Sequence, residues 1–252
     1  MTDSNPSGSL PPLLPSGGLA IPPVAPPSVP LGEEPTDREP IAGVFGAVEA
    51  ILRQPRRIVY ALHNGEAGGL AWGLLFIAVL CALVYGLVVG TFSGKMQLWA
   101  APLKVSLGLL FSVLICLPSL YIFSCLSGSR ARLSEVCGLL AGLLALMTVL
   151  LVGFAPVAWI FSQSTQSLAA MGSLHLIFWA IATYFGVRFL RHSFSHLGGK
   201  PAGLRVWTVI FVLVMMQMTS ALRPLVGTAD TLLPPSTEKK FFLTHWKEHL
   251  NR

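Results

Sequence analysis

Residues 133–161 read LSEVCGLLAGLLALMTVLLVGFAPVAWIF, and this stretch decides the fold. Glu135 is its only charged side chain, and the run exceeds the roughly 20 apolar residues that a helix needs to cross the hydrocarbon of a membrane. We expect a membrane-spanning helix that is long enough to tilt or to break at Pro156. The remainder of the chain is therefore interpreted first as part of a membrane protein.

Four further apolar runs have spanning length, at residues 69–92, 102–126, 168–190 and 204–226. Charged residues make up 11% of the chain, whereas a soluble domain carries about 25%. With residues 133–161, these runs predict an all-α, polytopic membrane protein. Its five transmembrane helices would form a compact bundle over residues 67–227, with the lipid bilayer as its first partner.

Basic residues flank the predicted spans unevenly. One side carries Arg38, Arg53, Arg56, Arg57, Arg130, Arg132, Arg188, Arg191, Lys200 and Arg205, and the other carries Lys95 and Lys104. Cytoplasmic loops are enriched in Lys and Arg, which predicts an integral protein of the cell membrane (the inner membrane in a bacterium), with a cytoplasmic N-terminus and an external C-terminus. The C-terminal tail disagrees with this orientation, because its lysines favour a cytoplasmic location for the tail. The net charge of +6 is explained by orientation, and no nucleic-acid partner is expected.

Tryptophans near span ends support this frame. Trp72 and Trp207 lie near the predicted cytoplasmic ends, and Trp99 and Trp159 lie near the outer ends. Such positions are typical of an interfacial aromatic belt.

The segments outside the spans have distinct compositions. Residues 1–40 are proline-rich and are predicted to be a disordered tail. In residues 41–66, apolar residues recur at helical spacing over 41–52, which indicates an amphipathic interfacial helix followed by a linker. Its arginines would contact anionic lipid, or the helix would pack on a protein partner. Residues 228–252 predict a second interfacial helix in a C-terminal tail.

Glycines four residues apart mark close-packing faces within the spans: Gly69 and Gly73, Gly86, Gly90 and Gly94, and Gly138 and Gly142. Small residues at this spacing let helix backbones approach each other. The faces would serve packing within the bundle or homo-oligomerisation.

Enzymatic constellations are absent from the sequence. There is no HExxH, GxSxG or phosphate-binding glycine loop, and the four cysteines show no CxxC spacing. Glu33, Glu34 and Arg38 match the EExxxR pattern of intramembrane proteases but precede every span. Glu135 is expected to favour its helix N-terminus and to pair with Arg130 or Arg132. We expect a protein that is not an enzyme and has no cofactor, metal site or disulfide framework.

Polar residues gather in the outer halves of the last three spans. The stretch MMQMTSALRPLVG (residues 215–227) supplies Gln217, Thr219 and Arg223. Gln163 lies just beyond the third span, and His175 lies seven residues into the fourth span, about 10 Å below its outer end. Polar side chains are costly in lipid, so these should face the bundle interior. They form a candidate polar cluster, which is either a pocket open to the outer side or a set of interhelical hydrogen bonds.

The segment ILRQPRRIVYALHNG (residues 51–65) and the five spans after it resemble the Yip1-like membrane proteins in layout. The resemblance rests on the L-x-x-P stretch at residues 52–55 before the first span. It implies a cytoplasmic N-terminal region and a compact five-helix domain. The chain lacks the DLYGP-type and GY-type motifs of the trafficking members, so no functional residue is transferred from the family.

Two functions remain open from the sequence. The first is a non-enzymatic organiser or adaptor of a membrane complex, with the N-terminal tail and the helix at residues 41–52 contacting a protein partner. The alternative is a small transporter or channel that uses the candidate polar cluster.

Overall fold

The computed structural model describes residues 30–65, 67–93, 97–129, 131–165, 167–198 and 201–221. These residues form a short 3-10 helix and seven α-helices, and no strand occurs within the described ranges. The elements are η1 (Pro35–Arg38), α1 (Gly43–Arg53), α2 (Pro55–His63), α3 (Ala67–Ser93), α4 (Gln97–Leu126), α5 (Leu133–Ser164), α6 (Leu168–His196) and α7 (Pro201–Ala221). The all-α prediction is therefore confirmed for the described chain.

Four helices, α3 to α6, are long and apolar enough to cross a membrane. They match the first four predicted spans, and each extends the prediction by a few residues at one or both ends. Pro156 does not end α5, which continues through it to Ser164. The apolar part of α7 covers the shorter stretch Gly203–Met218. Residues 222–226 of the fifth predicted span lie outside the described residues, so that span stays a prediction, as does the interfacial tail at residues 228–252.

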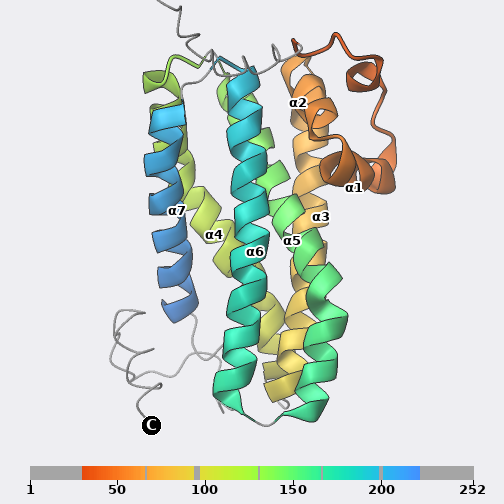
Figure 1. The fold of residues 1–252 in the computed structure, drawn as a ribbon, viewed down its shortest axis with the longest axis vertical. Helices are drawn as coiled ribbons and strands as arrows, with labels where there is room; N and C mark the ends of the chain where they lie inside the picture. The colour runs from red at the N-terminus through yellow and green to blue at the C-terminus, as the bar shows by residue number, and fades with distance from the viewer. Residues whose placement is uncertain are drawn as a thin grey trace, which may run out of the picture.

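The long helices run roughly alongside one another in Figure 1, with α1 and α2 at one end. The helix α5 packs against α3 and α6, α3 packs against α4, and α7 packs mainly on α4. Contact between α6 and α7 is slight. The connections alternate, so the starts of α3, α5 and α7 share the α1/α2 end with the final turns of α4 and α6.

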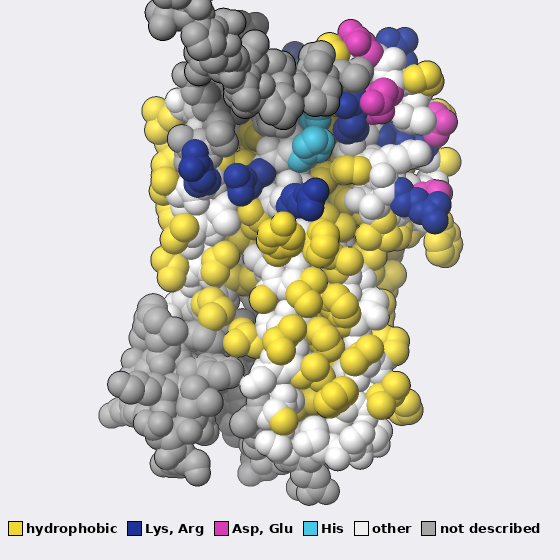
Figure 2. Space-filling view, viewed as in Figure 1, with side chains coloured by type: hydrophobic (Ala, Val, Ile, Leu, Met, Phe, Trp, Pro, Cys, Tyr) yellow, Lys and Arg dark blue, Asp and Glu magenta, His cyan; other side chains and the backbone are white. Residues whose placement is uncertain are grey.

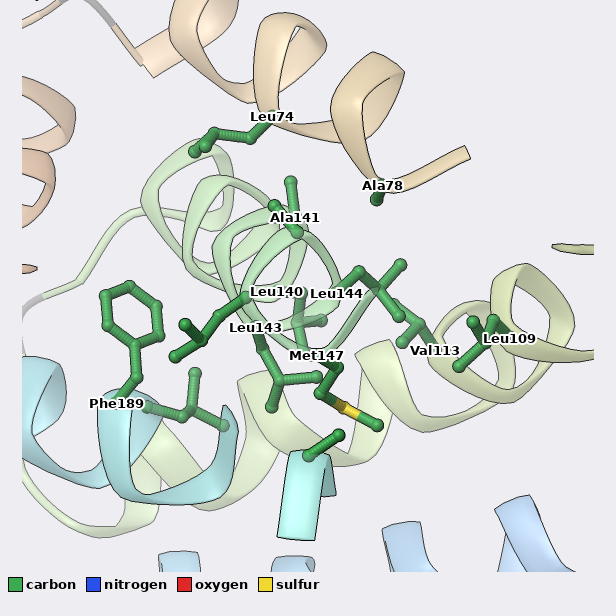
Figure 3. Packing of buried hydrophobic residues seen from close by; sticks show 14 of the residues in the cluster. Leu74, Ala78, Leu109, Val113, Leu140, Ala141, Leu143, Leu144, Met147 and Phe189 are labelled. Carbon is green, nitrogen blue, oxygen red and sulfur yellow. The ribbon is translucent and has the colours of Figure 1, made fainter. Parts of the chain in front are cut away.

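The core is centred on α5. Leu140, Leu143, Leu144 and Met147 have at most 1% of their surface exposed, and Figure 3 shows them among side chains of α3, α4 and α6. A helix with apolar side chains on every face is suited to an interior position. The central helix is therefore the stretch with the longest apolar run in the sequence.

Glycines act in two ways within this core. An ideal Cβ on Gly86 would lie 2.4 Å from the Pro102 Cα, so α3 and α4 meet backbone to backbone there. Gly138 and Gly142 instead make room for side chains of this chain, chiefly Leu62 and Phe189. These glycines serve packing within the chain. Gly69 and Gly73 face open space, and their use in homo-oligomerisation stays a prediction.

The N-terminal region is more ordered than its composition predicts. Residues 1–29 of the predicted disordered tail lie outside the described residues, but residues 30–40 have a defined path that includes η1. The predicted linker contains a second helix, α2, which begins at Pro55. Proline suits the first position of a helix, because its missing N–H would be unpaired there in any case. Ile58, Val59 and Leu62 of α2 are buried in the core. We call residues 30–63 the cap.

The surface separates charge from apolar residues. Figure 2 shows Lys and Arg side chains gathered at the α1/α2 end, above a surface where hydrophobic side chains dominate. Trp72, Trp99 and Trp159 are more than half exposed, as a belt requires, but Trp207 is fully buried and does not belong to it. Lys104, which the sequence analysis placed with the outer loop, is buried within α4.

The contact at Gly86 gives a first prediction. We expect Gly86→Ala to destabilise the protein by about 1–3 kcal/mol, because the added methyl group meets the backbone of Pro102 and the two helices must separate. Gly73→Ala is the matched control, since a Cβ there meets nothing within 4 Å. Thermal unfolding in detergent measures both. Equal stability of the two variants would contradict the close contact between α3 and α4.

Candidate functional site

The described members of the candidate polar cluster occupy different environments. His175 is buried on α6, whereas Gln163 at the end of α5 is exposed and its amide nitrogen donates to the Ser162 hydroxyl at 3.2 Å. Gln217 is exposed on α7, which packs mainly on α4. The side chain of Thr219 and the whole of Arg223 lie outside the described residues. No hydrogen bond joins Gln163 to His175 in the described part of the chain, and the cluster as a whole stays a prediction.

His175 instead pairs with a residue that the sequence analysis did not single out. The Tyr85 hydroxyl lies 2.6 Å from the His175 Nδ1, and both side chains are buried. The two rings meet edge to face, and Trp179 packs against Tyr85 in the same manner. Tyr85 lies about 12 Å from the outer end of α3, and His175 about 10 Å from the outer end of α6, at 1.5 Å per residue. The similar depth of the two residues below the outer ends of their helices is the sequence feature that could have predicted their contact.

The second nitrogen of His175 makes this pair chemically notable. Nε2 is buried and has no hydrogen-bond partner within the described residues. If Tyr85 donates to Nδ1, Nε2 carries an unpaired N–H, and if Nδ1 donates, Nε2 is an unpaired acceptor. Either tautomer leaves one hydrogen bond to be made in the outer half of the bundle.

An ion pair in the cap holds residues 30–40 against α2. The Arg56 guanidinium contacts both carboxylate oxygens of Asp37, at 3.3 and 3.0 Å, and donates to the Pro30 carbonyl at 3.1 Å. The Gly32 N–H donates to the same carboxylate at 3.0 Å. Gly32 has a φ of +89°, and a Cβ there would lie 2.5 Å from the Tyr60 ring. We call Asp37, Arg56 and Gly32 the latch.

The Asp37 carboxylate is stabilised in its charged form. Burial raises the pKa of Asp37, but the hydrogen bonds from Arg56 and Gly32 and the positive charge of Arg56 outweigh burial and hold the pKa below its ordinary value. Next to the latch, Arg57 donates to the carbonyls of Glu39 and Pro40. Arg56 and Arg57 were expected to contact anionic lipid, and the structure uses both to fix the cap instead.

Glu135 stabilises the start of α5, as the sequence predicted. Its carboxylate accepts a hydrogen bond from the Arg132 backbone N–H at 3.1 Å, which satisfies one of the unpaired donors of a helix N-terminus. Its other oxygen lies 3.3 Å from Nδ1 of His63 at the end of α2. Of the two predicted arginine partners, Arg132 forms no ion pair with Glu135 among the described residues, and Arg130 lies outside them. The observed contact is with a histidine that links the cap to the bundle.

Known proteins and metal chemistry add no assignment. Comparisons with protein-family models, curated proteins and solved structures found no match to this chain. The described residues contain no group of three His, Cys, Asp or Glu side chains that could hold a metal ion, and the four cysteines are unpaired. The candidate sites are therefore defined by geometry alone: the Tyr85–His175 pair and the latched cap.

The latch gives a second prediction. Asp37→Ala should release residues 30–40 from α2, because Arg56 and the Gly32 N–H lose their shared acceptor. We expect about 10- to 100-fold faster amide hydrogen exchange in this segment, since leaving a buried hydrogen-bonding group without its partner costs about 1–3 kcal/mol. Glu49→Ala is the control, because Glu49 and Arg53 form an exposed pair at 3.6 Å, and such pairs contribute about 0–1 kcal/mol.

The latch also has a defined pH dependence. Since the folded pKa of Asp37 lies below its ordinary value of 3.8, its contribution to stability is complete above about pH 4 and is lost as the pH falls through the folded pKa. Protection of residues 30–40 should therefore stay constant from neutral pH down to about pH 5. A loss of protection between pH 7 and 5 would contradict the assignment.

The Tyr85–His175 pair gives a third prediction. Tyr85→Phe should cost about 1–3 kcal/mol, because it leaves Nδ1 of His175 buried without a partner. The double variant Tyr85→Phe/His175→Leu should cost less than the sum of the single variants, since it removes both polar groups. Unfolding of the four proteins in mixed detergent measures the coupling. Additive losses would show that the hydrogen bond contributes nothing.

Proposed function

We propose that this chain is a non-enzymatic organiser or adaptor in a membrane complex, with five spans and a cytoplasmic cap that contacts a protein partner. The observation that carries the proposal is the cap itself. Residues before the first apolar helix fold into η1, α1 and α2, and the latch and the buried residues of α2 fix them on the end of the bundle. A mere leader to the first span would need no such fixed structure.

The surface of α1 supports a docking role. One side of this helix is buried against the bundle through Ala47, Ala50 and Ile51. Beside it lies an apolar stripe formed by Val44, Phe45 and Leu52, which are 45%, 90% and 46% exposed. The remaining side carries Glu49 and Arg53. An exposed apolar stripe on a rigidly held helix offers the anchors that a partner helix or loop needs.

The orientation of the proposal follows the charge. Every described arginine lies towards the α1/α2 end of the bundle. These arginines are on η1, α1, α2, the start of α5, the last third of α6 and the start of α7. This distribution favours a cytoplasmic cap under the positive-inside rule. A fifth span that begins with α7 would then place the C-terminus outside.

A small transporter or channel is the second candidate function. Its support is the unmet hydrogen bond of His175 Nε2 inside the bundle, since intramembrane polar groups often mark transport paths. Against it stands the tight packing among α3, α4 and α5, where the cavity has a volume of about 10 Å³, at the lower limit for one water molecule. The larger space along α6 is not lined by His175. The adaptor is therefore the better supported function.

Affinity purification from native membranes tests the proposal. We expect specific proteins to co-purify with the wild type, and to be lost from Phe45→Ser/Leu52→Ser because the apolar anchors are removed. Glu49→Gln, on the polar side of the same helix, should retain them. Isolation of the wild type without any companion would count against the adaptor. Solute flux in reconstituted vesicles that disappears in His175→Leu would favour the transporter.

A further inference from the structure

A groove opens between α6 and α7 because each of these helices packs on a different neighbour. The Trp207 indole N–H on α7 donates to the Cys116 carbonyl on α4 at 3.0 Å, and Trp207 stacks on Phe211. These contacts hold α7 against α4, whereas α6 packs on α5. The space that this arrangement leaves along α6, lined by residues of α1, α5 and α7 as well as α6, has a volume of about 1480 Å³. We call it the lateral groove.

The lateral groove is polar at one end and apolar over the rest of its length. Arg188, Arg191, His192 and Ser195 line it, and their spacing of three and four residues places them on one face of α6. Deeper in the bundle its walls are formed mainly by apolar side chains, among them Leu146, Leu150, Leu176, Val212 and Met215. No carboxylate lines the groove among the described residues.

The two arginines have no partner in the described part of the chain. Arg188 and Arg191 are exposed, and neither takes part in any of the hydrogen bonds or ion pairs formed among the described residues. Arg56 and Arg57, by contrast, are fixed by the cap. In Figure 2 the cationic side chains lie along the boundary where the hydrophobic surface begins. We take this boundary as the level of the lipid headgroups, because cations are enriched at that level of a membrane protein.

The depth of the groove matches one leaflet. From Arg188 to Leu176 the helix descends about 18 Å at 1.5 Å per residue, and half of the hydrocarbon thickness is about 15 Å. A fatty acyl chain that hangs from a headgroup at the arginines would therefore lie along the apolar walls. The length of the groove and the position of its arginines both fit a lipid with a charged headgroup and an acyl chain.

We propose that the lateral groove binds an anionic phospholipid from the leaflet on the cap side. Arg188 and Arg191 hold the phosphate, and an acyl chain lies along the apolar walls of the groove. The excess of cations without a nearby carboxylate favours lipids with a net negative charge over zwitterionic lipids. This site goes beyond the proposed adaptor function, which rests on the exposed stripe of α1; the two surfaces have Leu52 in common.

Native mass spectrometry of the delipidated full chain in detergent tests the site with added phosphatidylglycerol or phosphatidylcholine of the same acyl chains. We expect the wild type to bind phosphatidylglycerol more tightly than phosphatidylcholine, and Arg188→Gln/Arg191→Gln to lose about 30-fold in affinity for phosphatidylglycerol, as the removal of two interfacial cations should cost. Arg53→Gln/Arg205→Gln is the matched control. It removes the same charge from two exposed arginines that do not line the groove, and should bind as the wild type does.

A second variant separates the groove from general attraction to charge. Val212→Trp fills the apolar part of the groove and should lower the affinity for both lipids without changing the net charge. An equal loss in the two double-arginine variants, or unchanged binding in Val212→Trp, would overturn the proposal. A dimer that Val212→Trp abolishes would assign the groove to a second copy of the chain. Lipid binding that rises on removal of residues 222–252 would assign it to that segment.

Discussion

The burial of the first half of α5 on all sides, from Gly138 to Thr148, is the constraint on which the rest of the structure depends. Within a membrane, lipid is as apolar as leucine, so burial of apolar surface gives no drive for helices to associate. Association then depends on shape, and the central helix must offer a surface into which its neighbours fit. Gly138 and Gly142 provide it, since the space where their side chains would stand is filled by Leu62 and Phe189. One helix thus receives the cap and α6 on the same small-residue face.

The position of α7 follows from this arrangement. The helices α3 and α6 occupy the sides of α5, and α4 packs chiefly on α3, so the last helix finds its place on α4. Its attachment there is specific, because the Trp207 N–H must be satisfied and the Cys116 carbonyl satisfies it. The helix that is fixed to α4 cannot also close on α6. The lateral groove is therefore a result of the same packing that gives the bundle its order.

Much of the fold could be predicted from the sequence, because helix formation in a membrane depends on local composition. The first four spans agree with α3 to α6, and Glu135 lies at a helix start as expected. What the sequence could not supply depends on contacts between distant segments. The proline-rich composition of residues 1–40 indicates that they cannot form a core of their own, and gives no sign that Asp37 would meet Arg56.

The candidate polar cluster shows the same limit. The position of His175 within a span correctly indicated a buried polar residue. Its partner, however, is Tyr85 on α3, which lies in an otherwise apolar run. Trp207 was assigned to the interface because tryptophan near a span end is typical of a belt, yet its N–H binds a neighbouring helix. In both cases the residue type was informative, and the pairing of helices decided its role.

The cap and the lateral groove share a wall, so the two proposed binding surfaces are next to each other. Ile51, Leu52 and Pro55 of the cap line the groove at the end that carries Arg191 and His192. A ligand seated at that end touches the cap and the bundle together. By thermodynamic linkage, whatever the ligand contributes to the docking of the cap equals what the docked cap contributes to the affinity of the ligand. Because Leu52 also belongs to the exposed stripe of α1, a protein partner on the cap and a lipid in the groove would compete for, or share, the same side chain.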